Sequence, residues 1–306
     1  MAEPAVEVAG LVKRYGATTA ADGVSLTVQR GTVTAVLGPN GAGKTTTLET
    51  CEGYRRPDGG RVRVLGLDPA TEGAELRPRI GVMLQDGGCY PGARPLEMLR
   101  LIAAFHANPL EPRMLVDRLG LGPALRTTYR RLSGGQRQRL GVALAVVGRP
   151  ELVFLDEPTA GLDPQGRRAS WELVKQLRDD GVTVVLTTHH MDEAERLSDW
   201  VVILHHGRVV AEGTPDELTA GDAEDVVRFR GPSGLDLTTL RSALSEDCVA
   251  LESPPGTYRI EGQIDPQVLA TLTAWCAQHG FLASGLAVQR RTLEDVYLDL
   301  TGRELR

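Results

Sequence analysis

The chain has 306 residues, of which 42% are hydrophobic and 24% charged, and its formal net charge is −6. This length exceeds one typical domain, so we expect one large domain and one smaller one. The acidic balance disfavours duplex nucleic acid, and no nucleic-acid partner is expected. No stretch reaches the roughly 18 apolar residues of a membrane span, and the N-terminus lacks the apolar segment of a signal peptide. The chain is therefore not expected to cross a bilayer by itself.

The cysteines give no sign of a metal site or a disulfide framework. No two have C-x-x-C spacing, and no histidine is placed to complete a zinc site. We interpret them as scattered buried thiols in a reducing cytoplasm. They are Cys51, Cys89, Cys248 and Cys276.

The first part of the chain predicts strands separated by turns. The candidate strands are Val6–Val8, Ser25–Val28, Thr32–Leu37, Arg61–Leu65 and Ile80–Leu84. The run at Thr32–Leu37 ends in a glycine-rich turn, after which a helix is expected from Gly43 to about Gly53.

A helical block is predicted from Pro95 to about Gly148. Its first helix is expected to bury Leu96, Leu99, Leu101, Ile102, Ala103 and Phe105. Its second is expected to bury Leu115, Val116, Leu119 and Leu121, and its third covers Gln136–Val147.

The sequence returns to strands after this block. Glu151–Leu155 is apolar without alternation, as in a strand covered on both faces. Helix 165–179 follows, and then strands at Val182–Thr187, Trp200–Leu204 and Arg208–Ala211. Strands that alternate with helices predict an α/β sheet, here with an inserted helical block.

The character changes after about Gly221, where short strands and two helices predict a small α+β unit. The strands are Val226–Arg230, Val249–Leu251, Tyr258–Glu261 and Leu286–Gln289. The helices are Leu235–Leu244 and Pro266–Gln278, and a last helix opens near Thr292. We therefore expect a large domain over 1–221, with a helical subdomain at about 87–148, and a small C-terminal domain over 222–306.

A phosphate-binding loop is predicted where GPNGAGKT, residues 38–45, fits G-x-x-x-x-G-K-[ST] between a strand and a helix. Glycines let backbone N–H groups surround a polyphosphate, and the helix N-terminus favours anions. Lys44 is expected to neutralise the β- and γ-phosphates, and Thr45 to offer a hydroxyl to Mg²⁺. The expected ATP contacts are Gly38, Pro39, Asn40, Gly41, Ala42, Gly43, Lys44, Thr45 and Thr46.

Two carboxylates end the predicted buried strand, at Asp156 and Glu157. A phosphate-loop enzyme needs an acid at a strand end to hold the hydrated Mg²⁺, and Asp156 fits that role. Glu157 is placed to orient and polarise the attacking water. The alternative is that the pair only caps the next segment.

A third motif makes the pattern specific. The sequence Leu132-Ser133-Gly134-Gly135-Gln136 lies between the phosphate loop and the Asp-Glu strand. This order of motifs resembles the ABC ATPases over roughly residues 6–218. The resemblance implies a P-loop α/β fold with a mixed sheet core, N-terminal antiparallel strands and an inserted helical subdomain. It also implies a head-to-tail dimer, of two copies or with a paralogous ATPase, in which Ser133, Gly134, Gly135 and Gln136 bind the ATP of the other subunit.

Other positions match the family one at a time. Tyr15 resembles the aromatic residue that stacks on adenine, and Gln85 resembles the glutamine that senses Mg²⁺ and water and touches the transport partner. Asp163 lies in a segment resembling the D-loop at the dimer interface. His189 resembles the histidine that contacts the γ-phosphate, and His190 is the weaker candidate. The resemblance implies catalysis by Glu157, His189, Lys44 and Gln85, and Mg²⁺ binding by Thr45, Gln85 and Asp156.

The C-terminal tail, LEDVYLDLTGREL at residues 293–305, resembles stand-alone ATPases of ABC-2-type exporters, including the daunorubicin-resistance type. It implies a separate ABC-2-type membrane permease, a peripheral position on the cytoplasmic face of the membrane, and export of a drug, an antibiotic or another hydrophobic compound. Three alternatives stay open: an importer ATPase, a non-transport ABC ATPase acting on ribosomes or DNA, and a nucleotide-binding regulator without turnover.

Overall fold

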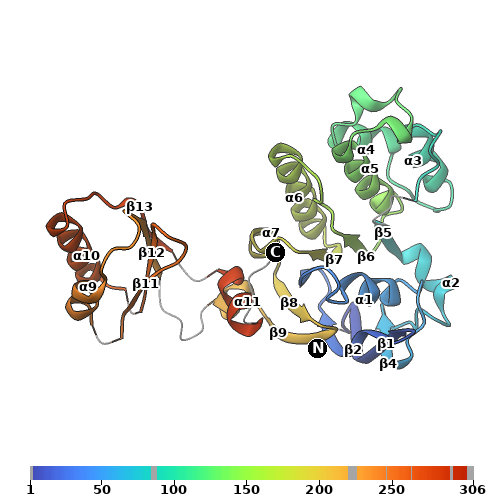
Figure 1. The fold of residues 1–306 in the computed structure, drawn as a ribbon. Helices are drawn as coiled ribbons and strands as arrows, with labels where there is room; N and C mark the ends of the chain where they lie inside the picture. Colours follow the sequence, from blue (N-terminus) through green and yellow to red (C-terminus); the bar gives the residue numbers. More distant parts are fainter. Residues whose placement is uncertain are drawn as a thin grey trace. The chain divides into compact units, whose positions relative to one another are not determined.

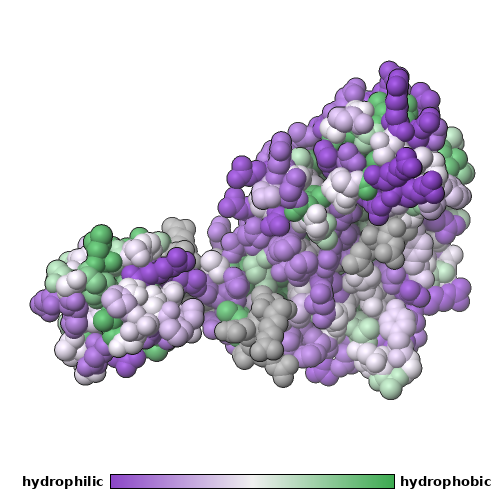
Figure 2. All heavy atoms as spheres, turned by 45° about the horizontal axis from the view of Figure 1, so that its top comes forward, coloured by the Kyte–Doolittle hydropathy of each residue, from purple (hydrophilic) through white to green (hydrophobic). Residues whose placement is uncertain are grey.

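The computed structural model describes residues 3–83, 88–219, 226–245, 247–262, 264–289 and 292–301. The chain divides into two compact units, the first over 1–215 and the second over 216–304. The part described contains no helix with the length and apolarity that a bilayer crossing requires. Hydrophilic side chains predominate on the face of the first unit seen in Figure 2.

A six-stranded sheet is the centre of the first unit (Figure 1). Five strands are parallel and the last is antiparallel, and β3, β6 and β7 are buried at every position, as expected for strands covered on both faces. Because the carboxyl ends of parallel strands lie at one edge of a sheet, the residues that follow β3, β6 and β7 meet there. The order is β5 (Ile80–Met83), β6 (Leu152–Asp156), β7 (Thr183–Thr188), β3 (Val33–Leu37), β8 (Trp200–His205) and β9 (Arg208–Gly213).

A three-stranded antiparallel sheet, in the order β2-β1-β4, packs with the central sheet around a shared hydrophobic core. The strands are β1 (Val6–Tyr15), β2 (Thr18–Val28) and β4 (Gly59–Val64). β1 and β2 are much longer than the sequence predicts. Their pairing contains register shifts between Val8 and Leu11 and again near Lys13, and these bulges interrupt the alternation on which the prediction rested.

Helices flank the central sheet and connect its strands (Figure 1). α1 follows β3, α6 lies between β6 and β7, and α7 lies between β7 and β8. The strand–helix alternation confirms the predicted α/β class. The bounds are α1 (Lys44–Cys51), α2 (Gly73–Leu76), α6 (Pro164–Asp179), α7 (Met191–Leu197) and α8 (Pro215–Thr219).

The inserted block contains α3 (Pro95–Ala103), α4 (Pro112–Arg118) and α5 (Gly134–Val146). α5 crosses β5 so closely that a Cβ on Gly81 would lie 2.0 Å from the carbonyl oxygen of Ala145. The predicted buried face of α3 is wrong at two positions, because Leu101 is 41% and Phe105 77% exposed. Leu101 is not on the face of α3 that buries Met98, Leu99 and Ala103, and Phe105 comes after the helix has ended.

The second unit is the small α+β fold predicted from the sequence. Its antiparallel sheet has the order β11-β12-β10-β13, and it has its own hydrophobic core, which includes Phe229, Tyr258 and Trp275. α9 is shorter than the predicted Leu235–Leu244. The strands are β10 (Val226–Arg230), β11 (Val249–Glu252), β12 (Thr257–Glu261) and β13 (Ser284–Gln289), and the helices are α9 (Thr238–Ala243), α10 (Pro266–Gln278) and α11 (Leu293–Thr301).

Candidate functional site

The glycine-rich turn joins β3 to α1, and Lys44 is the first residue of that helix. Its side chain is only 4% exposed, and its Nζ donates to the carbonyl oxygens of Gly38 at 2.8 Å and Pro39 at 3.1 Å. Gly43 has a φ of 99°, and a Cβ there would lie 2.3 Å from the carbonyl oxygen of Ala20. Only glycine fits this position, because both the backbone angle and the neighbouring strand exclude a side chain.

Asp156 ends β6 beside the start of α1. The hydroxyl of Thr45 donates to its Oδ2 at 3.0 Å, and the hydroxyl of Thr187 donates to its Oδ1. The carboxylate is buried, and both of its oxygens are held. The oxygens of Thr45 and Asp156 form a hard donor pair of the kind that binds Mg²⁺ together with phosphate oxygens.

Glu157 leaves the strand with a φ of 48°, in the left-handed region that residues with side chains rarely adopt. Its N–H donates to Thr187 Oγ1 at 2.9 Å, and its carbonyl accepts from Gln138 Nε2 at 3.0 Å. Its Oε1 lies 3.7 Å from Lys44 Nζ and 3.2 Å from His189 Nδ1. This backbone turn, fixed at two hydrogen bonds, brings one carboxylate to the phosphate loop and to the histidine after β7.

Burial governs the electrostatics of this cluster. Removal of water lowers the pKa of Lys44 below its usual value, while the charges of Glu157 and Asp156 act in the opposite direction. Burial also lowers the pKa of His190, with smaller effects in the same direction from His189 and Arg167. Charges with little water around them interact strongly, so the cluster is suited to act on the charge of a bound phosphate.

The two adjacent histidines are not equivalent. Their rings are in contact, with centroids 4.1 Å apart, but it is His189 whose ring nitrogen lies next to Glu157. His190 is the N-cap residue of α7, and its backbone N–H donates to Thr188 Oγ1 at 2.9 Å. His189 therefore lies in the carboxylate cluster, and its contact with a γ-phosphate stays a prediction.

The LSGGQ segment forms the N-terminus of α5. Ser133 is its N-cap: the serine hydroxyl accepts from Gln136 N–H at 3.2 Å, and Gln136 Oε1 accepts from Ser133 N–H at 3.0 Å. This capping box leaves Ser133 and Gly134 exposed. Within the described chain, a Cβ on Gly135 would lie 3.2 Å from the Leu162 side chain. Because Ser133 and Gly134 are exposed, the N-terminus of α5 is accessible there, and a helix N-terminus is a good site for an anion.

The remaining predicted residues are more dispersed. Tyr15, the last residue of β1, is 41% exposed, and Lys13 Nζ and Arg55 Cζ lie 5.7 and 5.8 Å from its ring centroid. Asp163 is exposed and caps α6 by accepting from Gly166 N–H at 2.7 Å. Gln85 lies outside the described residues.

Sequence reasoning missed a buried hub at Glu193. This carboxylate is 0% exposed, and it accepts hydrogen bonds from Thr188 at 2.6 Å, Thr159 at 3.0 Å and Trp171 Nε1 at 3.1 Å. Glu193 therefore links three parts of the chain: Thr188, which precedes His189; Thr159, which follows Glu157 closely; and Trp171 of α6. In the sequence, Glu193 is one glutamate in the stretch after His189, and nothing distinguishes it there from an exposed acid on a helix.

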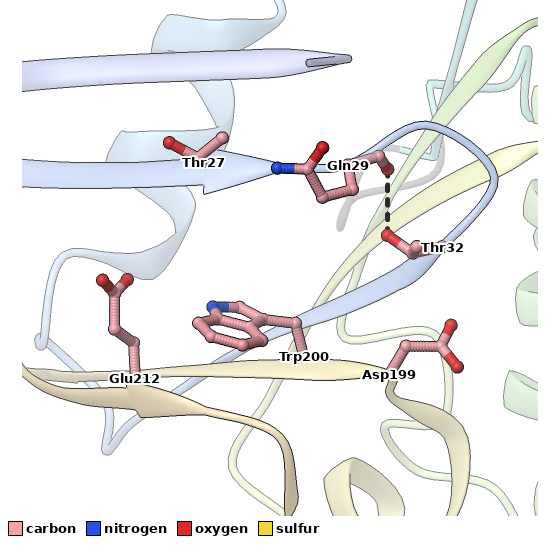
Figure 3. Close-up of a pocket in the computed structure, with 6 residues that line it drawn as sticks. All are labelled: Thr27, Gln29, Thr32, Asp199, Trp200 and Glu212. Carbon is pink, nitrogen blue, oxygen red and sulfur yellow. Dashed lines mark hydrogen bonds between the residues drawn. The ribbon is translucent and has the colours of Figure 1, made fainter. Parts of the chain in front are cut away.

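The described part of the chain also has hollows outside the phosphate cluster. One, of about 200 Å³, lies near Thr32, Asp199 and Trp200, where the indole faces the space between Thr27 and Glu212 (Figure 3). These residues stand at the starts of β3 and β8, so this pocket is at the opposite end of the strands from the phosphate loop. Another is a groove of about 430 Å³ that runs from the end of α1 across β5 to α3 and α5.

The geometry defines the class of protein. A strand–loop–helix with Lys44, an acid at the end of β6 and the neighbouring Glu157 are the parts of a phosphate-loop nucleoside triphosphatase.

The family model described as ABC transporter matches residues 21–160. The chain is 40% identical to daunorubicin resistance ATP-binding protein DrrA3 of Streptomyces coeruleorubidus, over 100% of this chain and 98% of the relative. It is 38% identical to Nod factor export ATP-binding protein I of Ralstonia nicotianae, over 99% of this chain and 95% of that relative.

Solved structures agree. One described as the ATP-binding subunit of an ABC transporter has a TM-score of 0.64 and 32% identity over 70% of this chain and 92% of that chain. Another, a dimeric post-hydrolysis state of the ATP-binding cassette MJ0796 bound to ADP and Pi, has a TM-score of 0.63 and 25% identity over 68% of this chain and 98% of that chain. The chain belongs to the ATP-binding proteins of ABC transporters. It is an ATPase, and ATP is its nucleotide.

Proposed function

We propose that the chain powers export through a separate ABC-2-type membrane permease, acting as a head-to-tail dimer on the cytoplasmic face of the membrane. The observation that carries the proposal is that Lys44, Asp156 and Glu157 lie close together. The cluster therefore places a phosphate-binding lysine next to a carboxylate that can activate water. The export direction is supported by relatives named for daunorubicin resistance and for Nod factor export, which match this chain over nearly its whole length. Nothing favours the importer, ribosome or DNA alternatives.

The proposed chemistry divides the roles among the clustered residues. Lys44 and the backbone of the loop hold the β- and γ-phosphates, and Thr45 and Asp156 would hold Mg²⁺, which would neutralise phosphate charge. Glu157 accepts a proton from water as the water oxygen bonds to the γ-phosphorus and the bond from that phosphorus to the bridging β-phosphate oxygen breaks, so that ADP leaves. His189 lies beside Glu157 and contacts the γ-phosphate. Gln85 is proposed to sense this site.

The dimer is proposed because one chain presents two separate anion sites. The phosphate loop is one, and the open N-terminus of α5 with Ser133, Gly134 and Gly135 is the other. A second copy or a paralogous ATPase would place its LSGGQ segment over the ATP on the first, with Asp163 at the shared boundary. ATP would then join the two subunits, and hydrolysis would release them.

Mixing two inactive variants tests the dimer. Lys44→Ala disables the phosphate loop, and Ser133→Arg disables the opposing anion site. In a head-to-tail dimer, a mixed pair retains one intact site, so an equimolar mixture is expected to recover about a quarter of wild-type ATP hydrolysis. An inactive mixture, with both variants folded by circular dichroism, would exclude sites shared between subunits.

Inside-out vesicles test the export direction. Vesicles that contain the chain and its co-purified membrane protein are expected to accumulate daunorubicin or another hydrophobic test compound when ATP is added. Vesicles with Glu157→Gln serve as the control. ATP-driven loss of compound from preloaded vesicles would instead indicate import.

A further inference from the structure

The pocket of about 200 Å³ at the starts of β3 and β8 combines an aromatic ring with negative charge. Trp200 is half-buried, and its indole faces the space between Thr27 of β2 and Glu212 of β9 (Figure 3). Among the described residues that line the pocket, Asp199 and Glu212 are acids and none is basic. An indole ring and carboxylates without a cation of their own complement a positively charged ligand.

The two carboxylates are not equivalent. Asp199 Oδ2 accepts from Val33 N–H at 2.8 Å, and its Oδ1 accepts from Arg178 Nη1 at 3.5 Å. Glu212 is exposed, and its side chain has neither a hydrogen bond nor an ion pair with any described residue. Asp199 therefore holds the start of β3, whereas the charge of Glu212 is open to a ligand.

The pairing of β8 with β9 fixes the position of Glu212 relative to the indole. Glu212 is in register with Val202, so these two residues lie on the same face of the sheet. Trp200 precedes Val202 by two residues and lies on that face as well. Regular strand geometry, rather than a loop, therefore places the ring and the free carboxylate side by side.

A buried hydroxyl on the same side of the sheet is a second, independent observation. Thr34 of β3 is 0% exposed, and its Oγ1 has no hydrogen-bond partner among the described residues. It is in register with Trp200 on the neighbouring strand, and it follows the pocket residue Thr32 by two positions. A buried hydroxyl without a partner is uncommon in a folded protein, and it points to a polar group from outside the chain.

We propose that this pocket binds a small organic ammonium ion, with the charged nitrogen over the Trp200 ring and next to the Glu212 carboxylate. The unpartnered Thr34 favours a ligand that also carries a hydroxyl group. The volume of about 200 Å³ limits the ligand to a compact molecule. This site is separate from the ATP site, at the opposite end of the central strands, and it goes beyond the proposed transport function.

The test uses the full chain, labelled with ¹⁵N, and two ammonium probes with uncharged counterparts of similar shape. The probes are choline and benzylamine, and the counterparts are 3,3-dimethyl-1-butanol and benzyl alcohol. The chain has three tryptophans, so the indole N–H signals in NMR spectra report the place of binding. Both amines are expected to shift the Trp200 signal and to leave those of Trp171 and Trp275 unchanged. Each alcohol should bind at least about tenfold more weakly, because it lacks the charge.

Two variants assign the ring and the carboxylate, with affinity measured by titration calorimetry. Trp200→Leu removes the aromatic face and is expected to weaken choline binding at least about tenfold. Glu212→Gln keeps the shape of an exposed side chain and should weaken it about fivefold or more. Glu172→Gln, the same substitution at an exposed acid of α6 outside the pocket, is the matched control and should bind as wild type.

Each contrary result overturns a stated part of the proposal. If neither amine shifts the Trp200 signal of the wild type, the pocket is not an ammonium site. If the alcohols bind as tightly as the amines, the pocket accepts apolar molecules and the charge recognition is wrong. If Glu212→Gln binds as tightly as Glu172→Gln, Glu212 does not recognise the ligand. Thermal unfolding of each variant checks that lost binding is not lost folding.

Discussion

Glu157 Oε1 lies between two basic groups, 3.7 Å from Lys44 Nζ and 3.2 Å from His189 Nδ1. The three residues come from three segments, which follow β3, β6 and β7 at one edge of the sheet. Hydrogen bonds on its N–H and carbonyl hold the backbone of Glu157, so the fold fixes the point from which its side chain reaches Lys44 and His189. This arrangement lets one side chain act on water next to a phosphate held by Lys44.

Glu157→Gln should separate ATP binding from ATP hydrolysis. The amide keeps the shape of the side chain but cannot accept a proton from water, so we expect turnover to fall by about 10² to 10⁴-fold with ATP binding retained. Steady-state phosphate release and nucleotide binding measure the two effects. Glu172→Gln, at an exposed acid of α6, is the control, and near-normal turnover in Glu157→Gln would remove this residue from the base role.

Tyr15 should contribute to nucleotide affinity through its ring rather than its hydroxyl. The ring is partly exposed and has Lys13 and Arg55 near it, so a flat base can stack there beside two cations. We expect Tyr15→Ala to weaken ATP binding by about tenfold and Tyr15→Phe to change it little. Titration with a fluorescent ATP analogue measures both, and equal losses in the two variants would contradict stacking.

The sequence predicted the parts of the fold that follow a simple period or a fixed motif. The buried strand before Asp156 has no alternation because it is covered on both faces, and the phosphate loop has its own spacing. β1 and β2 were predicted too short because bulges near Val8 and Lys13 break the alternation. Phe105 was assigned to a buried face because the pattern gives no sign that α3 ends at Ala103.

The candidate site was predicted by motif, but its internal connections were not. Which of two neighbouring histidines meets Glu157 depends on how the chain leaves β7. The motif register favoured His189 for contact with the γ-phosphate, and that role stays a prediction. Gln138 and Thr187 support Glu157 through its backbone, and such contacts leave no pattern in the sequence. A buried glutamate such as Glu193 was missed for the same reason, since acids are usually exposed.

Glu193 should be necessary both for stability and for turnover. Its three hydrogen bonds join Thr188, Thr159 and Trp171, so Glu193→Ala leaves two buried hydroxyls and one half-buried indole N–H without their acceptor. We expect a loss of about 3 kcal/mol or more in the free energy of unfolding, measured by urea titration. The exposed neighbour Asp192 provides the control, since Asp192→Asn should stay within about 0.5 kcal/mol of wild type.

The conservative variant Glu193→Gln distinguishes positioning from folding. The amide accepts fewer hydrogen bonds than the carboxylate, so Thr188 and the adjacent His189 are held less firmly in a chain that still folds. We expect kcat to fall about tenfold or more with little change in KM, because the phosphate loop is untouched. A loss of stability with unchanged kcat would make Glu193 a purely structural residue.

Glu52 should make the stability of the chain depend on pH in a direction unusual for a carboxylate. In the unfolded chain the group loses its proton near the ordinary glutamate pKa of 4.5, whereas burial raises the pKa in the folded chain to about 8. Between these values the folded chain binds more protons than the unfolded chain, so the Glu52 contribution to stability falls as pH rises from about 4.5 to 8. The contribution is fully present below that interval and lost above it, with a total of several kcal/mol at about 1.4 kcal/mol per pKa unit.

Glu52→Gln removes this effect because the amide carries no charge at any of these pH values. We expect the variant and the wild type to have similar Tm values at pH 5 and the variant to be the more stable of the two at pH 9, by calorimetry at each pH. Glu75→Gln should follow the wild type throughout, since that acid is exposed. If the difference between Glu52→Gln and wild type were the same at pH 5 and pH 9, Glu52 would not titrate within this interval, and the buried acid would be charged in the free chain at neutral pH.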